Sequence, residues 1–205
     1  MDLMIGIDFD NTIASYDSLA SQIVVEWGLF ERGAVTNVKQ IRTQLRAKSG
    51  GEIRWRDLQA AMYGRRISGA ETTDGLMEFL RECAEKGVRV AVVSHKTRHA
   101  ERDTEQIDLR ASALGWLRSK GLLDPDQFGL NESVIYFEPT PASKARRVAE
   151  IGCTHFIDDN PLVFMESDFP ETAEKILFSP GGEEKVPDGV IETRNWAEIA
   201  SRILV

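Results

Sequence analysis

Two carboxylates stand two residues apart in the segment D-F-D-N-T, which begins at Asp8 and contains Asp10. The apolar run Leu3–Phe9 predicts a short buried strand, so the pair stands at its carboxyl end, where α/β sheets bind their ligands. Positions i and i+2 share a face of a strand, and a sharp turn here lets both carboxylates point into one crevice. Such a pair can divide the chemistry, because one carboxylate attacks while the other transfers a proton. An isolated D-x-D is otherwise better explained by a capping aspartate followed by a turn aspartate.

Three more polar positions follow predicted strands or begin the helix after one. Ser94 ends the run V-A-V-V-S, where its hydroxyl can donate to a phosphate oxygen, although serine is also a common N-cap. Lys144 lies in the first turn of a predicted helix, as either a solvated surface lysine or a cation aimed at a phosphate and a carboxylate. Asp158 and Asp159 repel each other at a strand end, and a hard divalent cation would compensate for this. A turn begun by Asp-Asn-Pro is the alternative for Asp159 alone.

Basic residues near these positions suggest wider anion recognition. His95 and Lys96 follow the serine; Lys96 and Arg98 can widen an anion site, whereas His95 is equally well explained as a packed or solvent-facing residue. The cluster R-W-R, from Arg54 to Arg56, can recognise a second anionic or ring-shaped part of a substrate. A solvated helix face with one packed tryptophan is the simpler interpretation of that cluster and the one we favour.

The elements that hold these residues alternate between short strands and helices. Short apolar runs predict five strands, at Leu3–Phe9, Val88–Val93, Val134–Phe137, His155–Ile157 and Lys175–Phe178. Apolar positions at helical spacing predict three helices, at Gly75–Glu85, Gln106–Lys120 and Ala142–Ile151. This alternation predicts an α/β fold, a Rossmann-like and mainly parallel sheet with flanking helices.

The stretch from residue 14 to residue 73 breaks this rhythm. It contains no convincing strand and predicts helices around Ser18–Trp27, Val35–Lys48 and Trp55–Tyr63. We therefore expect a small helical cap domain at residues 14–73, inserted into a core domain formed by residues 1–13 and 74–205. The segment Ser179–Gly189 is predicted to be a polar loop.

The order of the motifs resembles that of the haloacid dehalogenase (HAD) superfamily of phosphohydrolases. D-F-D-N-T matches the first of its four motifs, Ser94 the second, Lys144 the third and the pair Asp158–Asp159 the fourth. The resemblance covers roughly residues 1–13 and 74–180. The helical stretch after the first motif matches, in position, the cap that many members carry there.

The resemblance implies a role for each matched residue. Asp8 attacks phosphorus and forms an aspartyl-phosphate, and Asp10 protonates the leaving oxygen and then activates the hydrolytic water. Thr12 supports the turn of the motif. Ser94 and Lys144 hold the transferring phosphoryl group. The implied enzyme is a phosphatase whose cap closes over the site and selects the substrate.

The resemblance also implies a bound Mg²⁺ ion. Its ligands are Asp8, the backbone carbonyl of Asp10, and Asp158, with Asp159 assisting directly or through water. Ile157 replaces the small residue or glycine that the family has before this aspartate, so which of the two touches the metal stays open. Charge counting supports the same ion independently, because four carboxylates carry about −4 and a phosphate monoester about −1.5 to −2. One lysine offsets little of this charge, whereas Mg²⁺ supplies two positive charges and a defined geometry.

The composition restricts the partners. The net charge of −8 gives no basic surface for nucleic acid, so we expect a small phosphorylated metabolite as the partner and no nucleic acid. Cys83 and Cys153 lie far apart, and the three histidines form no H-E-x-x-H, so neither a disulfide framework nor a zinc site is expected. We see no signal-peptide pattern and no membrane span, and expect a cytoplasmic protein without a membrane partner. The oligomeric state cannot be read from the sequence.

Three other classes of function share parts of this pattern. A signalling receiver domain needs its phospho-acceptor at the third strand, and a dinucleotide enzyme needs a G-x-G-x-x-G that is absent after the first strand. A catalytically inactive binding module is disfavoured by the intact set of carboxylates. Phosphotransfer to an acceptor other than water is the alternative that uses the same motifs. Sugar phosphates and nucleoside monophosphates both remain open as substrates.

Overall fold

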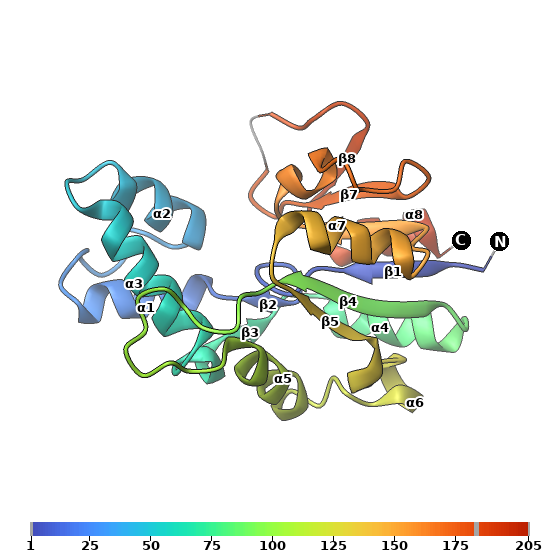
Figure 1. The fold of residues 1–205 in the computed structure, drawn as a ribbon, viewed down its shortest axis with the longest axis horizontal. Helices are drawn as coiled ribbons and strands as arrows, with labels where there is room; N and C mark the ends of the chain where they lie inside the picture. The colour runs from blue at the N-terminus through green and yellow to red at the C-terminus, as the bar shows by residue number, and fades with distance from the viewer. Residues whose placement is uncertain (1, 183–184, 205) are drawn as a thin grey trace.

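The central layer of the molecule is a six-stranded sheet (Figure 1). In this computed structural model, which describes residues 2–182 and 185–204, the strand order is β5-β4-β1-β6-β7-β8. The strands are β1 (Met4–Ile7), β4 (Arg89–His95), β5 (Ile135–Glu138), β6 (His155–Asp158), β7 (Glu174–Phe178) and β8 (Val190–Thr193). Every neighbouring pair is parallel, so the carboxyl ends of the strands meet at one edge. The predicted α/β fold with a mainly parallel sheet is confirmed.

β1 lies in the middle of the sheet, and its sequence suits that position. All four of its residues are buried, and Gly6 is aligned with Ala91 of β4 on one side and Phe156 of β6 on the other. A Cβ at Gly6 would lie 2.6 Å from the Phe156 ring and 2.7 Å from the sulfur of Cys153. Glycine therefore lets these side chains pack directly over the strand, which holds the start of the Asp8 turn in place.

Helices cover both faces of the sheet. They are α4 (Leu76–Glu85), α5 (Leu109–Ser119), α6 (Pro125–Phe128), α7 (Pro141–Glu150) and α8 (Trp196–Ile203). Ile5 and Ile7 face a large apolar cluster shared with α4, α5, α6 and α8, whereas Met4 faces a smaller cluster shared with α7. This division follows the two-residue period of a strand and produces a helix–sheet–helix sandwich. Within the described ranges, no helix is long and apolar enough to cross a membrane.

Residues 14–73 form a helical insertion that leaves the core directly after the Asp8 turn. Its elements are β2 (Ala14–Ser15), α1 (Asp17–Glu26), α2 (Val38–Arg46), α3 (Gly51–Tyr63), the 3-10 turn Ile67–Gly69 and β3 (Glu71–Thr72). β2 and β3 pair antiparallel, so the two ends of the insertion meet at the core. Figure 1 shows α1, α2 and α3 beyond the carboxyl ends of the strands, where they face the edge that carries the predicted site.

The carboxyl-terminal part differs from the sequence-based expectation. β8 and α8 are additional elements, and the predicted polar loop Ser179–Gly189 lies between β7 and β8 as far as residues 179–182 and 185–189 describe it. β8 is an edge strand with only Thr193 buried, so it lacks the continuous apolar run that marks a central strand. The buried positions of α8 span eight residues, which is too short for a clear helical period. The strands β2 and β3, of two residues each, give no pattern that a sequence can show.

Candidate active site

The first motif forms a tight turn at the carboxyl end of β1. The Asp8 amide donates to the Ile157 carbonyl at 2.8 Å, which extends the β1–β6 ladder by one residue. Asn11 has φ of 61°, a left-handed conformation that asparagine tolerates better than most residues, and its amide donates to the Ala14 carbonyl at 2.8 Å. The turn lets both Asp8 and Asp10 line a single cavity.

Lys144 lies beside Asp8 because α7 begins at the edge where β1 and β6 end. Its Nζ donates to Asp8 Oδ1 and, at 2.6 Å, to Asp158 Oδ2, and none of the three side chains is more than 6% exposed. A capping box fixes the start of the helix, with the Thr140 hydroxyl accepting the Ser143 amide at 3.1 Å. Burial lowers the pKa of Lys144, but Asp158 and Asp8 outweigh burial and raise that pKa above its ordinary value. The lysine is therefore a permanent cation at this edge.

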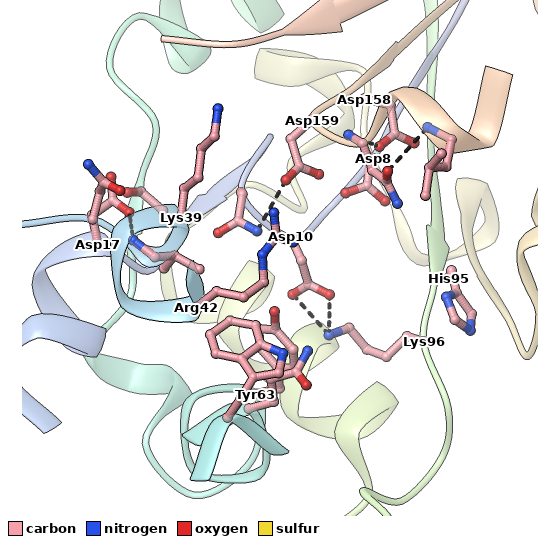
Figure 2. A pocket seen from close by; sticks show the side chains of 18 of the residues that line it. Asp8, Asp10, Asp17, Lys39, Arg42, Tyr63, His95, Lys96, Asp158 and Asp159 are labelled. Carbon is pink, nitrogen blue, oxygen red and sulfur yellow. Dashed lines mark hydrogen bonds and ion pairs between the residues drawn. The ribbon is translucent and has the colours of Figure 1, made fainter. Parts of the chain in front are cut away.

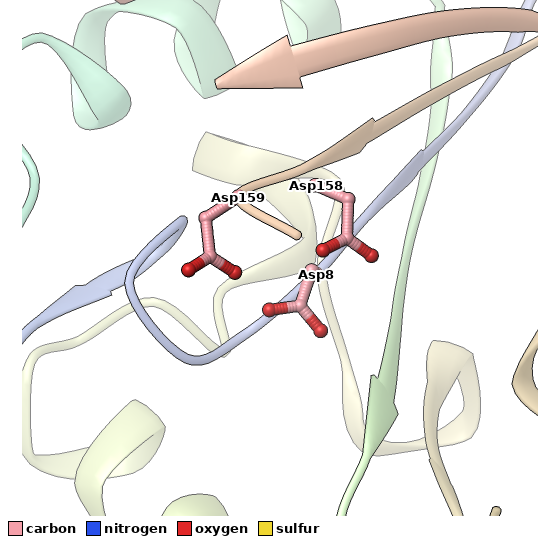
Figure 3. Close-up of side chains that lie close together, drawn as sticks. All are labelled: Asp8, Asp158 and Asp159. Atoms are coloured by element: carbon pink, nitrogen blue, oxygen red, sulfur yellow. The ribbon is translucent and has the colours of Figure 1, made fainter. Parts of the chain in front are cut away.

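Asp8, Asp158 and Asp159 bring carboxylate oxygens within 4.8 Å of one another (Figure 3). Asp158 Oδ1 accepts the backbone amide two residues later at 2.9 Å, so both of its oxygens have donors. Among the described residues, Asp159 accepts one hydrogen bond, from the Asn11 side chain at 3.3 Å. Burial raises the pKa of Asp8 to about 7 against the opposing effect of Lys144, and burial followed by the Asp158 charge raises the pKa of Asp159. One lysine does not neutralise three such carboxylates, and the all-oxygen donor set suits a hard metal ion.

Asp10 is paired with a second buried lysine, Lys96 (Figure 2). The Lys96 Nζ lies 2.7 Å and 3.0 Å from the two carboxylate oxygens of Asp10. The Tyr16 hydroxyl donates to Asp10 Oδ1 at 2.7 Å. Lys96 Nζ also lies over the rings of Tyr63, at 4.7 Å, and Phe9, at 5.3 Å. Both oxygens of Asp10 accept hydrogen bonds, as an ionised carboxylate does.

Tyr16 and Tyr63 are site residues that the sequence did not reveal. They come from two separate parts of the helical insertion, just before α1 and at the end of α3, and their rings meet edge to face at 5.0 Å. Burial and then the charge of Asp10 raise the pKa of Tyr16, so its hydroxyl keeps its proton and remains a donor. Buried tyrosines usually belong to a core, and the one available signal was that Tyr16 stands six residues after Asp10.

The two hydroxyl residues of the predicted site, Ser94 and Thr12, are buried and lie outside the cavity lining. Neither Oγ has a hydrogen-bond partner within the described part of the chain. Thr12 contributes through its backbone, since its carbonyl accepts the Thr73 hydroxyl at 2.6 Å and so ties the turn to the end of the insertion. Ser94 lies in β4, one residue before its carboxyl end, opposite Phe137 of β5. An unpartnered buried hydroxyl costs stability, and the Ser94 hydroxyl is such a group within the described residues.

His95, the last residue of β4, lines the cavity together with Lys96. Its Nε2 lies 3.2 Å from the Pro139 carbonyl. Burial and the charge of Lys144 lower the pKa of His95, which favours the neutral ring. Figure 2 shows this ring on the side of Lys96 away from Arg42.

The arginines of the predicted cap cluster are divided between two sides of α3. Arg56 lines the cavity, where its guanidinium pairs with Glu52 at 3.4 Å and with Glu101. Arg54 is exposed and does not line the cavity, because two residues correspond to about 200° around a helix. Arg54 therefore lies outside the cavity, whereas Arg56 lines it and is paired with two glutamates, and substrate binding by either arginine stays a prediction.

The cavity has a volume of about 1560 Å³ and lies between the sheet edge and the insertion. Its floor consists of Asp8, Asp10, Asp158 and Asp159. Its roof consists of residues from α2 and α3, among them Lys39, Arg42 and Trp55 (Figure 2). Acidic groups that suit a cation therefore face a roof that carries basic side chains.

Comparisons with known proteins agree with this architecture. No protein-family model and no curated protein matches the sequence. The HAD-hydrolase YfnB from Bacillus subtilis, solved bound to magnesium, matches over 100% of this chain and 99% of its own at 12% identity, with a TM-score of 0.59. A HAD family hydrolase from Deinococcus radiodurans R1, solved with bound phosphate and sodium, matches over 98% of this chain and 94% of its own at 18% identity, with a TM-score of 0.55. An L-2-haloacid dehalogenase matches over 100% and 99% at 12% identity, with a TM-score of 0.57. Identities this low concern the fold alone, and this chain has the fold of the haloacid dehalogenase-like hydrolases.

Proposed function

We propose that this chain is a magnesium-dependent phosphohydrolase that acts on a small phosphorylated metabolite through an aspartyl-phosphate on Asp8. The observation that carries the proposal is the surroundings of Asp8. A buried lysine, Lys144, contacts both Asp8 and Asp158, and Asp159 completes a group of carboxylates within 4.8 Å. A carboxylate nucleophile needs its charge held in place by such neighbours, and the bound cation that these carboxylates favour would keep Asp8 ionised.

Magnesium would be held by Asp8, the backbone carbonyl of Asp10, Asp158 and Asp159. When bound, it neutralises charge on the phosphoryl group during transfer. We assign the stronger direct contact to Asp159, because Asp158 already commits both oxygens to Lys144 and a backbone amide. Asp159 has one long hydrogen bond and the less compensated charge. This order reverses the one implied by the motif resemblance.

The residues of the chain divide the reaction between them. An oxygen of Asp8 attacks phosphorus, the bond to the leaving oxygen breaks, and that oxygen takes a proton from Asp10. Water then attacks the phosphorus of the aspartyl-phosphate while Asp10 accepts a proton from the water. The bond between phosphorus and the Asp8 oxygen breaks, so inorganic phosphate leaves and the Asp8 carboxylate is restored. Lys144 holds Asp8 in position and offsets its charge, and Lys96 and Tyr16 orient Asp10. Asp10 must gain a proton before it can donate one, and that proton weakens its ion pair with Lys96.

Phosphate transfer fits these residues better than the removal of halide from a 2-haloacid, the reaction named for one structural relative. A halide leaves without a proton, so that reaction has no use for a second carboxylate held beside the nucleophile by Lys96. Dehalogenation also involves no dianionic substrate. A phosphate dianion beside the three carboxylates is what would make a bound cation necessary. Phosphotransfer to an acceptor other than water uses the same residues and is the alternative.

We further propose that the helical insertion is a mobile lid over the site. It joins the core through the two-residue ladder of β2 and β3, and the structure of YfnB is described as revealing interdomain movement. A sugar phosphate or a nucleoside monophosphate fits a cavity of about 1560 Å³ under a closing lid, whereas a folded phosphoprotein or duplex nucleic acid does not. The free, buried Cys83 and Cys153 are consistent with a reducing, cytoplasmic location.

The test is a panel of phosphorylated metabolites, with phosphate release measured in Mg²⁺, in Ca²⁺ and in excess EDTA. We expect release in Mg²⁺ and none in EDTA, and we expect Ca²⁺ to fail because it is larger and takes more ligands. Chloride release from 2-chloropropionate is measured alongside. Chloride release without phosphate release, or full activity in EDTA, would overturn the proposal. Ranking by kcat/KM then separates sugar phosphates from nucleotides, and an added alcohol acceptor detects phosphotransfer.

A further inference from the structure

Helix α2 places a row of cations in the roof of the cavity. Lys39, Arg42 and Arg46 stand at positions i, i+3 and i+7, so they share one face of the helix, and all three line the cavity. The buried face of α2 consists of Val38, Ile41 and Leu45. Each cation follows a buried residue by one position, or about 100° around the helix. The packing that anchors α2 therefore also directs the cations toward the cavity.

This row has no acidic compensation within its own helix. The sequence of α2, V-K-Q-I-R-T-Q-L-R, contains no aspartate or glutamate, and its first turn has no acidic residue. Cations three and four residues apart repel each other, and the first turn of a helix, where Lys39 stands, disfavours a cation. A solvent-facing helix surface usually intersperses both signs of charge. Compensation for the row must therefore come from other parts of the chain or from a bound anion.

Arg42 is the member of the row that is available to such an anion. Arg46 pairs with Glu52 at 2.6 Å and lies over Trp55 at 5.9 Å, and Lys39 has a partner as well. The remaining lysines and arginines of the cavity lining have carboxylate partners; they are Arg56, Lys96, Arg102 and Lys144. Within residues 2–182 and 185–204, Arg42 makes no hydrogen bond or ion pair. Figure 2 shows its side chain reaching from α2 toward Asp10, over the floor of the cavity.

We propose that Arg42 binds a second anionic group of the substrate, a carboxylate or a second phosphate that lies a few atoms from the phosphate ester. This inference rests on the proposed phosphohydrolase function and narrows its substrate class. A guanidinium binds either group through two parallel hydrogen bonds, which a partner-free arginine under a roof can provide without breaking an existing pair. The role that the sequence suggested for Arg54 and Arg56 thus belongs to Arg42 on the neighbouring helix.

The experiment compares substrates that differ in the second anion alone. The pairs are 3-phosphoglycerate with glycerol 3-phosphate, and fructose 1,6-bisphosphate with fructose 6-phosphate. The variants are Arg42→Gln and, as a matched control, Arg54→Gln, which removes an exposed arginine of the same insertion that does not line the cavity. We expect the wild type to prefer the doubly anionic member of at least one pair. Arg42→Gln should lower kcat/KM for that member by about 10- to 100-fold, as the loss of a charged hydrogen-bond partner does, and should leave the singly anionic member within about two-fold. Arg54→Gln should leave both unchanged.

Equal losses on both members would mean that Arg42 holds the transferring phosphoryl group, and the inference would be wrong. If Arg42→Gln lowers kcat/KM for neither member, or if the wild type does not prefer the doubly anionic member of any pair, the row is a solvated surface. Either result would also overturn the inference. Calorimetry with the Asp8→Asn variant in Mg²⁺ separates this inference from the proposed function. If the wild type releases no phosphate, selective binding of fructose 1,6-bisphosphate that Arg42→Gln abolishes would still support the anion site. Absence of that selectivity would reject it.

Discussion

The floor and the roof of the cavity handle charge in opposite ways. On the floor, Asp8 and Asp158 contact Lys144, Asp10 contacts Lys96, and these side chains are between 1% and 17% exposed. On the roof, the exposed Arg46 and Arg56 pair with exposed glutamates, and the exposed Arg42 makes no ion pair within the described part of the chain. A buried pair is costly to break, whereas an exposed pair contributes little. The floor is therefore fixed by folding, and the roof is free to vary with the substrate.

The largest effect is expected on the floor, at Asp8. Asp8→Asn removes the proposed nucleophile, since an amide does not form an acyl-phosphate, and should lower kcat by at least about 10⁴-fold. The amide has nearly the same shape, and Lys144 keeps its bond to Asp158, so circular dichroism should remain that of the wild type. Near-normal phosphate release from the folded variant would end the covalent mechanism.

Lys144 is expected to matter for folding as well as for activity. Lys144→Met leaves Asp8 and Asp158 buried without their cation, and removal of one partner from a buried pair costs about 3–5 kcal/mol. Thermal unfolding in EDTA should show a drop in Tm of about 10 °C for a chain of this size. Excess Mg²⁺ should recover part of that loss. A Tm within a degree or two of the wild type would show that this lysine does not neutralise the floor.

Substitution of Lys96 tests whether this lysine has a different role from Lys144. Lys96→Met should reduce kcat on alkyl phosphates by about 10- to 100-fold, because Asp10 loses the donor that orients it for proton transfer. The loss should be clearly smaller on 4-nitrophenyl phosphate, whose leaving group needs no proton. Asp10 is 17% exposed and keeps the Tyr16 hydroxyl, so the change in Tm should be smaller than for Lys144→Met. Equal losses on both classes of ester would assign Lys96 to substrate binding instead.

The charge of Asp159 is expected to destabilise the fold when no metal is bound. Its pKa is raised by burial, and a carboxyl whose folded pKa exceeds its unfolded pKa contributes stability at low pH that is lost as the pH rises through the folded pKa. In EDTA at pH 7, Asp159→Asn should therefore raise Tm by about 2–4 °C, and the difference should shrink as the pH falls toward about 4.

In excess Mg²⁺ the wild type should have a higher Tm than Asp159→Asn, because the ion stabilises the wild type more. Asp158→Asn is the matched comparison, since Asp158 Oδ2 accepts a hydrogen bond from the Lys144 Nζ, whose positive charge compensates it. A lower Tm for Asp159→Asn than for the wild type in EDTA would contradict the idea that its charge is uncompensated.

The floor was the part that the sequence predicted well, for a physical reason. Asp8, Lys144 and Asp158 each stand at a strand end or a helix start, which short apolar runs and capping residues mark locally. A parallel sheet then brings the carboxyl ends together at one edge, so local positions are enough to predict a long-range cluster. Ser94 shows the limit of this argument. Ser94 is buried one residue before the end of β4 and does not line the cavity, whereas His95, the last residue of β4, and Lys96 do.

The roof could not be predicted in the same way. The bonds of Lys96 and Tyr16 to Asp10 depend on how the helical insertion lies over the sheet edge, and no local pattern specifies that packing. Arg42 and Arg54 look alike in sequence as exposed helix arginines, and the buried stripe of α2 decides that Arg42 lines the cavity. For the same reason, β8 and α8 were not predicted. Each depends on a long-range contact, β8 with β7 and α8 with α4, that no local pattern specifies.

The smallest effect is expected at Arg56, and it tests whether the roof residues act independently. The Arg56 side chain is 45% exposed and its partners Glu52 and Glu101 are 48% and 75% exposed, so solvent screens both pairs. Arg56→Gln should change Tm by less than about 2 °C and kcat/KM by less than about two-fold on singly and doubly anionic substrates alike. The measurement repeats the substrate pairs used for Arg42→Gln, at low and at high salt. A loss at Arg56 as large as at Arg42, confined to the doubly anionic member, would mean that the arginines of α2 and α3 hold the second anion together. The roof would then be as constrained as the floor, and the contrast between them would fail.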